Sequence, residues 1–212
     1  MSKPVYKLYL MKPSLEAVLL PAEQQQTLMG KAAEILAQVG GKSLINGEIW
    51  SDEQYQFFGV EQFPNWQALR EHDRRLRDMN WFQYLESETF MGVDDPNNPT
   101  RQEPLSITEG SEGPFFLIYV GRFHSEFEVT EELMKEVEKF NQFMNELGTK
   151  DIISAICRIG NEAWTNFGVQ IIPSMEALEK KQAAQEKLNW WKYMEARTYL
   201  GSATGGELIK PG

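Results

Sequence analysis

Apolar residues recur along the chain with two periods, one typical of β-strands and one typical of helices. Alternating runs rich in β-branched and aromatic residues predict strands at residues 5–11, 42–50, 54–63 and 86–91, and again at 115–122, 151–159, 164–172 and 195–200. Apolar residues spaced three and four apart predict amphipathic helices at residues 22–39, 65–79, 130–147 and 174–188. The elements therefore follow the order β-α-β-β-α-β twice.

The two halves share this order because the chain repeats itself. The stretch FGVEQFPNWQAL at residues 58–69 returns as FGVQIIPSMEAL at residues 167–178. Residues 58–92 align with residues 167–201 without a gap, and twelve of these 35 positions are identical, against about two expected from ordinary composition. A unit of this length is a small domain rather than a solenoid repeat, so we interpret the chain as a duplication.

The order β-α-β-β-α-β is the ferredoxin-like motif. We expect one repeat at residues 1–92, a linker at 93–113 rich in Pro, Gly, Asn and Asp, a second repeat at 114–201, and a loosely ordered tail at 202–212. A four-stranded antiparallel sheet with both helices on one face leaves its other face bare, and two copies can cover each other's bare faces.

This arrangement resembles the dimeric α+β barrel superfamily, fused here into a single chain. The resemblance implies an α+β fold in which two tandem ferredoxin-like repeats pack sheet to sheet as a barrel. It rests on the order of elements alone. No catalytic motif of the superfamily's monooxygenases or polyketide cyclases is found in the sequence, so the resemblance assigns no residue a role.

Composition narrows the classes of partner. The formal net charge of −10 argues against a nucleic-acid surface, which needs clustered Lys and Arg. Cys157 is the only cysteine, which excludes a disulfide framework and favours a reducing compartment. No run approaches the roughly 18 apolar residues of a membrane span, and the N-terminal sequence does not resemble a signal peptide. We therefore expect a cytoplasmic monomer or homodimer with a small-molecule ligand and neither nucleic acid nor membrane as partner.

Strand alternation separates two faces, and we choose between them by their apolar character. Phe58 and Val60, like Phe167 and Val169, are apolar in both halves, so we assign them to the helix side. Their neighbours would then turn into the barrel. Its expected inner wall includes the candidate substrate-binding residues Tyr9, Trp50, Tyr119, Arg158 and Gln170. A mostly aromatic wall with a few polar groups is what a small organic ligand needs.

Glu61 and His124 are the candidate catalytic residues, placed in the same interior. A buried Glu61 carboxylate would be a usable base, unless it only pairs with Arg158 or reaches water. His124 follows a strand and could exchange protons near the mouth of the barrel, although a solvated loop histidine is the commoner case. We interpret Trp81 and Trp190, which are repeated in both halves, as packing residues that touch no pocket.

Cofactor chemistry finds little support in the sequence. Two distant histidines without paired cysteines give no zinc site, and no glycine-rich phosphate loop is present. Heme would need an axial ligand, and only His72 or His124 could be the usual one. We interpret His72 as a partly exposed helix residue. No cofactor and no metal are expected, and heme is kept as a remote alternative.

Three functions fit these patterns. The first is a cofactor-independent enzyme, such as a cyclase, isomerase, lyase or monooxygenase, that acts on an aromatic or polyketide-like substrate. The second is a ligand-binding or stress-associated protein without catalysis, and the third is a structural module whose interior is filled. A cavity with an unpaired Glu61 or His124 favours the first, a cavity lined by satisfied groups the second, and a filled interior the third.

Overall fold

Eight strands close into a barrel in the computed structural model, which describes residues 3–101, 103–107, 114–124, 130–159 and 163–211. The strand order is β1-β3-β2-β9-β6-β8-β7-β4, and neighbouring strands are antiparallel. The strands are β1 (Val5–Pro13), β2 (Lys42–Ile49), β3 (Phe57–Phe63) and β4 (Leu85–Asp94) in the first half, and β6 (Phe115–Phe123), β7 (Lys150–Ile159), β8 (Asn166–Ile172) and β9 (Met194–Gly205) in the second. The α+β fold expected from the sequence is confirmed.

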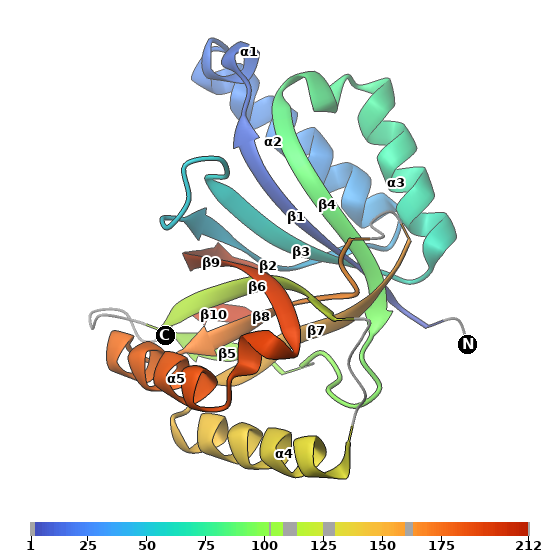
Figure 1. Cartoon of the computed structure of the whole chain (residues 1–212). Coiled ribbons are helices and arrows are strands. Elements are labelled where there is room, and N and C mark those ends of the chain that lie inside the picture. Colours follow the sequence, from blue (N-terminus) through green and yellow to red (C-terminus); the bar gives the residue numbers. More distant parts are fainter. Residues whose placement is uncertain (1–2, 102, 108–113, 125–129, 160–162, 212) are drawn as a thin grey trace.

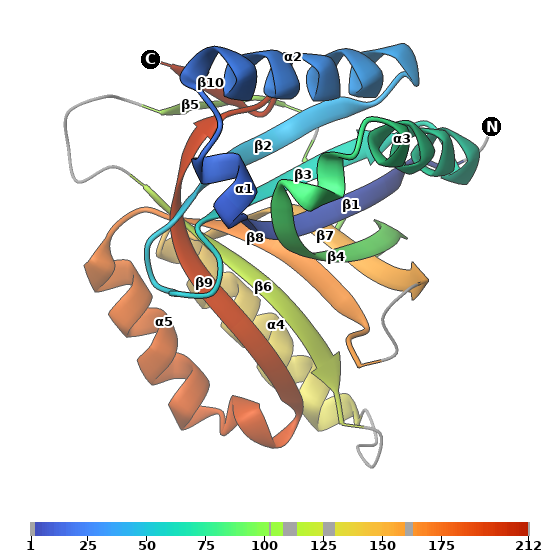
Figure 2. The ribbon, with the colours of Figure 1, turned by 90° about the horizontal axis from the view of Figure 1, so that it is seen from above.

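Helices cover the barrel on two opposite sides (Figures 1 and 2). The first half carries α1 (Leu15–Val18), α2 (Ala22–Gln38), α3 (Trp66–Asp78) and the 3-10 turn η1 (Trp81–Gln83); the second carries α4 (Glu131–Glu146), α5 (Met175–Lys187) and η2 (Trp190–Lys192). Asn65, Thr130 and Ser174 cap α3, α4 and α5, since each side chain accepts a hydrogen bond from the backbone N–H three residues on. In the described chain, no helix has the length and apolar character needed to cross a membrane.

The most apolar face of each half-sheet points into the barrel. Phe58, Val60, Phe167 and Val169 are at most 1% exposed and share one cluster with residues from both halves, among them Leu8, Leu10, Ile45, Phe90, Phe116, Ile118, Val120 and Ile153. The assignment of faces made from the sequence is therefore wrong. Helices cover one face of each half-sheet, and the second half-sheet covers its opposite face, so both faces are apolar. The more apolar of the two faces lies in the fully enclosed interior of the barrel.

The two half-sheets join at β2 with β9 and at β4 with β7, and the strand register shifts at both junctions. Gly92 and Gly201, identical in the aligned repeats, lie at these two places. A Cβ on Gly92 would come within 2.3 Å of the Ile156 carbonyl oxygen, and one on Gly201 within 2.3 Å of the Glu48 carbonyl oxygen. The repeat thus retains these glycines because the partner strand approaches too closely for a side chain.

The C-terminal segment is more ordered than expected. β9 continues to Gly205, and β10 (Ile209–Pro211) pairs in parallel with β5 (Leu105–Ile107) from the linker. Leu208, between β9 and β10 in the chain, is 3% exposed and belongs to the apolar cluster that fills the barrel. The expectation of a loosely ordered tail is therefore wrong over the described residues, because the tail has an apolar contact and a strand partner.

Glu88 on β4 and Arg197 on β9 are equivalent residues of the two repeats that contact each other. Arg197 donates to both carboxylate oxygens of Glu88, at 3.2 and 3.0 Å, and also contacts the Tyr199 hydroxyl. The Tyr55 hydroxyl donates to Glu88 at 3.0 Å. The two aligned positions thus carry opposite charges, and they form a complementary pair between the halves.

Replacing Glu88 by Arg should lower the free energy of unfolding by about 1–3 kcal/mol, because two guanidinium groups would then face each other and Tyr55 would lose its acceptor. Adding Arg197→Glu should restore most of this loss in urea denaturation. As a control, Glu195→Arg breaks an exposed pair with Arg122 and should cost less than about 1 kcal/mol. A charge-exchanged double variant no more stable than Glu88→Arg alone would contradict a specific pair.

Candidate functional site

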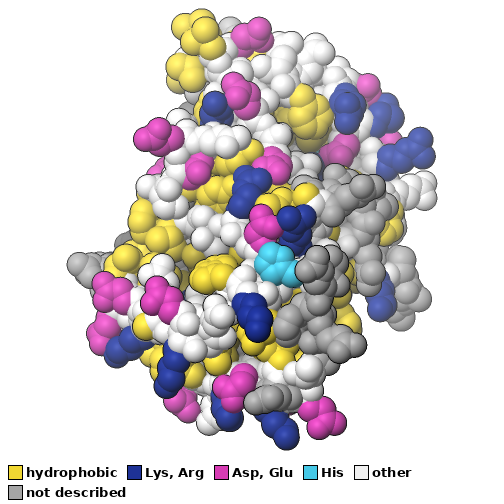
Figure 3. Space-filling view, viewed as in Figure 1, with side chains coloured by type: hydrophobic (Ala, Val, Ile, Leu, Met, Phe, Trp, Pro, Cys, Tyr) yellow, Lys and Arg dark blue, Asp and Glu magenta, His cyan; other side chains and the backbone are white. Residues whose placement is uncertain are grey.

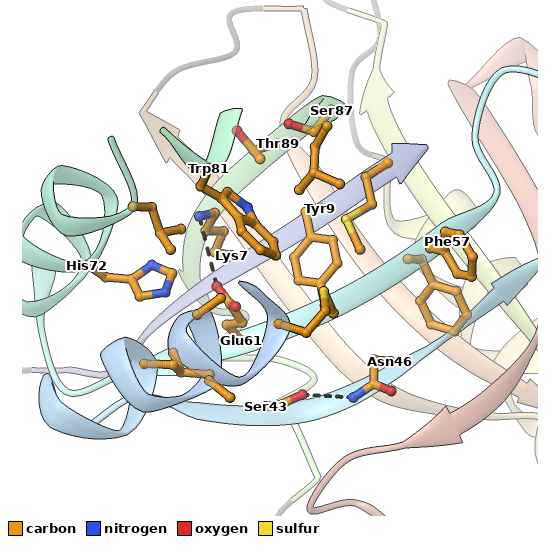
Figure 4. Close-up of a pocket in the computed structure, with 18 of the residues that line it drawn as sticks. Lys7, Tyr9, Ser43, Asn46, Phe57, Glu61, His72, Trp81, Ser87 and Thr89 are labelled. Atoms are coloured by element: carbon orange, nitrogen blue, oxygen red, sulfur yellow. Dashed lines mark hydrogen bonds and ion pairs between the residues drawn. The ribbon is translucent and has the colours of Figure 1, made fainter. Parts of the chain in front are cut away.

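A cavity of about 440 Å³ lies in the first half, between the outer face of the sheet and helices α2 and α3 (Figure 4). Its walls are mostly apolar, and include Tyr9, Met11, Met29, Ala32, Ala33, Leu36, Phe57, Leu76, Trp81 and Phe82. Polar side chains enter at separate places: Lys7, Glu61 and His72 at one end, Ser43 and Asn46 from β2, and Ser87 and Thr89 from β4. The composition is that of a pocket for a small organic molecule.

Small residues on α2 leave this space open. Gly40 and Gly148, with φ of 74° and 75°, end α2 and α4, so the two helices align at an offset of 108 and Ala32 corresponds to Phe140. In the second half, Phe140 stacks on Trp190 with ring centroids 5.2 Å apart. In the first half, the smaller Ala32 stands at this position and lines the cavity together with Trp81. One substitution pair thus explains why the first half retains a cavity beside its tryptophan.

Trp81 and Trp190 therefore differ in role. Trp81 is 9% exposed and lines the cavity, so the interpretation that it touches no pocket is wrong. Trp190 is half-buried against Phe140. Their repetition in the sequence indicated packing alone because the residue that distinguishes the two environments lies on another helix.

At the glycine of each repeated Phe-Gly-Val triplet, a tyrosine ring lies against the strand on the helix side. Tyr9 pairs with Gly59 across β1 and β3, and Tyr119 pairs with Gly168 across β6 and β8. A Cβ on Gly59 would overlap the Tyr9 ring, with its nearest atom at 2.1 Å, and one on Gly168 would lie 2.5 Å from the Tyr119 hydroxyl. Glycine is thus required where the tyrosine ring crosses the neighbouring strand, while Phe and Val on either side fill the barrel.

The Tyr9 and Tyr119 hydroxyls stay protonated in these sites. Burial and the nearby Glu61 carboxylate raise the pKa of Tyr9. Burial and Asp151 raise the pKa of Tyr119. Each tyrosine can therefore act as a hydrogen-bond donor throughout the physiological pH range.

Charged groups gather at one end of the cavity. The Lys7 ammonium donates to Asp73 at 2.8 Å and lies 3.9 Å from Glu61. Burial opposes ionisation of Asp73, but His72 and Lys7 outweigh it and lower the pKa of its carboxyl. His72 is 2% exposed, with Nδ1 3.5 Å from Asp73, so its interpretation as a partly exposed residue is wrong. Its ring points toward Lys7 and Glu61 (Figure 4).

The corresponding end of the second half is filled by its own hydrogen bonds. Gln170 stands at the position of Glu61 and accepts from Lys181 at 2.6 Å, and Asn98 donates to Asp151 at 2.8 Å. Burial lowers the pKa of Lys181 to about 8, and raises the pKa of Asp151. Together with Phe140, this cluster occupies the layer that is open in the first half.

The structure brings together only part of the predicted site. Glu61 and Tyr9 share the first-half cavity, but on the helix side of the sheet rather than in the barrel. Tyr119 and Gln170 lie in the second half, on the same outer face. Trp50 is 49% exposed and packs edge-on against Phe115, and His124 is exposed beyond the end of β6. The side chain of Arg158 lies outside the described residues. The proposed catalytic and binding roles of these residues stay predictions.

Sequence reasoning missed Lys7, His72 and Ala32 as residues of the site. Lys7 belongs to no motif that would single it out, and the sequence pattern indicated partial exposure for His72. A signal existed for Ala32, since its counterpart Phe140 is much larger. Comparing residue size between the repeats along the helices, as well as along the strands, would have indicated the cavity.

An apolar rim adjoins the cavity. A hollow of about 320 Å³ beside α1 shares Met29, Trp81 and Leu85 with it. Leu15, Val18 and Leu19 are 74%, 63% and 74% exposed, and hydrophobic side chains gather over α1 in Figure 3. The lining of the cavity thus leads to an exposed apolar surface, which suits the approach of an apolar molecule.

Metal and thiol chemistry are not supported by the described residues. Among them, no group of three or more His, Cys, Asp or Glu side chains could hold a metal ion. Burial raises the pKa of the Cys157 thiol to about 11, so it is protonated at neutral pH and a poor nucleophile.

Comparison with known proteins gives the fold and no family. No protein-family model matches the chain, and no curated protein matches its sequence. A chlorite dismutase from Candidatus Nitrospira defluvii in complex with imidazole matches with a TM-score of 0.73 at 13% identity, over 96% of this chain and 92% of that chain. A heme-binding protein from Thermus thermophilus matches with a TM-score of 0.68 at 10% identity, over 97% and 92%. The chain has their fold. At these identities the similarity shows the fold alone.

Stability should rise with pH above neutrality because of Lys181. Its pKa of about 8 lies below the roughly 10.4 of an unfolded lysine, so between these values the unfolded chain binds more protons and the native state gains as pH increases. Lys181 should contribute a gain of about 1–2 kcal/mol between pH 7.5 and 9.5, measured by denaturation as the difference between the wild type and Lys181→Met. The Cys157 thiol, whose pKa is raised to about 11, lowers stability over the same window, but it does so in the wild type and in the variants alike, so the difference isolates Lys181. Lys180→Met, on an exposed side chain, is the control and should keep the gain; an equal slope in both variants would contradict the assignment.

Proposed function

We propose that this protein binds a small, largely apolar organic molecule in the first-half cavity, and that the second half is a filled scaffold for it. The observation that supports this most strongly is the difference between Ala32 and Phe140 at equivalent positions. The second half shows that the fold can fill this layer with side chains. The first half leaves about 440 Å³ open next to Trp81.

Heme does not fit this cavity. Of the two histidines in the sequence, His72 alone lines it. The ring of His72 points toward Lys7 and Glu61, which occupy the space that a macrocycle on this histidine would need (Figure 4). Lys7 is also the only Lys or Arg among the cavity residues, and it already donates to Asp73 at 2.8 Å, so no lysine or arginine remains for the propionates. The proposal therefore concerns a smaller ligand than heme.

The test is to fill the cavity as the second half does. Ala32→Phe should place a phenyl group beside Trp81 and prevent binding, with little loss of stability. Indole and 2-naphthol are suitable probes, because a ligand that binds the native state raises the melting temperature. We expect both probes to stabilise the wild type and neither to stabilise Ala32→Phe.

Ala37→Phe provides the matched control, since Ala37 is an exposed alanine of the same helix outside the cavity lining. This variant should respond to both probes as the wild type does. Probe-induced stabilisation that survives Ala32→Phe would place binding elsewhere and refute the proposal.

Cofactor-independent catalysis on an aromatic or polyketide-like substrate is the second candidate, favoured by one observation. A carboxylate oxygen of Glu61 is buried beside the cavity without a hydrogen-bond partner among the described residues, which suits a general base. The Glu61 carboxylate would take a proton from the substrate carbon next to a carbonyl group, which leaves an enolate. It would then return the proton to the enolate.

2-Tetralone is a probe for this chemistry, because its acidic C–H groups lie beside an aromatic ring. In heavy water the wild type should catalyse exchange of these protons for deuterium, measured by NMR. Glu61→Gln should slow this exchange by about a hundredfold, within the usual contribution of a general base. Exchange no faster than in buffer alone would leave ligand binding as the function.

A further inference from the structure

The Glu61 carboxylate has acceptor capacity that the protein does not use. Its Oε2 atom is buried and has no hydrogen-bond partner among the described residues. Its nearest cation, the Lys7 ammonium, is 3.9 Å away, beyond hydrogen-bonding distance. A buried acceptor without a partner is costly, so its presence beside a cavity calls for a donor that arrives with the ligand.

In the second half, the side chain at the position equivalent to Glu61 has a hydrogen-bond partner within the protein. There Gln170 accepts a hydrogen bond from Lys181 on α5 at 2.6 Å. In the first half the residue equivalent to Lys181 is His72, and no hydrogen bond joins it to Glu61 in the described structure. Exchange of lysine for histidine on the helix thus leaves the strand acceptor open toward the cavity.

The charges at this end also select the sign of the ligand. Lys7 donates to Asp73 at 2.8 Å, and His72 Nδ1 lies 3.5 Å from Asp73. Both basic groups of the cluster therefore lie closer to Asp73 than Lys7 does to Glu61, at 3.9 Å. An anionic group placed beside Glu61 would face its carboxylate at low solvent exposure, which costs far more than on a surface. A neutral N–H or O–H group, or an ammonium, would instead be attracted to this carboxylate.

We infer that the ligand is a flat, mainly apolar molecule with one hydrogen-bond donor, whose donor group binds Glu61 while its ring lies between Tyr9 and Trp81. This inference rests on the proposed function, since it names the ligand class of the same cavity. His72 closes the same end, with its ring 5.1 Å from that of Phe63. The remaining wall offers mainly apolar contact, so the donor fixes the ligand's orientation.

Two matched pairs of probes isolate the donor. Indole and 1-methylindole differ in one N–H, and 2-naphthol and 2-methoxynaphthalene differ in one O–H. By calorimetry, the wild type should bind the donor member of each pair about tenfold more tightly, as expected for a hydrogen bond to a charged acceptor. The anion of 2-naphthoic acid should bind more weakly than 2-naphthol.

Substitution of Glu61 should remove this preference. Glu61→Leu should bind both members of a pair equally, and Glu61→Gln, which keeps a neutral acceptor and copies the second half, should retain a reduced preference. Glu86→Gln removes an exposed carboxylate and should keep the wild-type preference. If Glu61→Leu does not fold, the donor preference of Glu61→Gln compared with that of the wild type still tests the role of Glu61.

The outcomes separate the two proposals. Equal binding of donor and methylated probes to the wild type, still blocked by Ala32→Phe, would overturn the role of Glu61 and leave the binding function intact. A donor preference unchanged in Glu61→Gln and Glu61→Leu would also overturn it. Failure of all four neutral probes to bind would refute the proposed function, and this inference with it.

Discussion

The need to cover both faces of each half-sheet determines where this protein can hold a ligand. The inner faces cover each other, and residues from both halves, including Leu8, Phe58, Ile118 and Phe167, fill the barrel almost without exposure. A core packed in this way has no room for a guest. The outer faces are covered by helices, whose residues can change in size without disturbing the barrel. The cavity of the first half lies in this helix–sheet layer.

The helix–sheet layers of the two halves are filled differently. An unfilled apolar space lowers stability, and a single small domain has little to spare. The second half stacks Phe140 on Trp190 and bonds Gln170 to Lys181, and it also has a buried Asp151 Oδ1 atom without a hydrogen-bond partner among the described residues. It shares the barrel core with the first half, so its packing supports a neighbour with a less stable interior. This is the trade expected when stability and a binding site compete within one fold.

The sequence predicted the architecture well and the site only in part. The order of elements depends on local patterns, and the structure confirms it. The faces were reversed because alternation separates two sides of a strand without saying which is inside, and in a sheet covered on both sides each is apolar. Glu61 was found because it breaks the pattern of its repeat. The cavity was missed because it depends on a pairing between Ala32 and Trp81, residues on different elements that no local pattern connects.

The similar solved structures share the barrel. In our proposal, the barrel is the part of this protein that contributes least to ligand specificity. A main chain of this form accepts Phe140 and Lys181 in one copy and Ala32 and His72 in the other, within a single polypeptide. The two halves of this chain have the same fold and opposite capacities, one filled and one open. Similarity of fold at 10–13% identity therefore cannot decide what is bound. Our proposal places the choice of ligand in the side chains of α2, α3 and the outer face of β1 and β3, where a Glu61 oxygen without a hydrogen-bond partner among the described residues lies beside an apolar cavity.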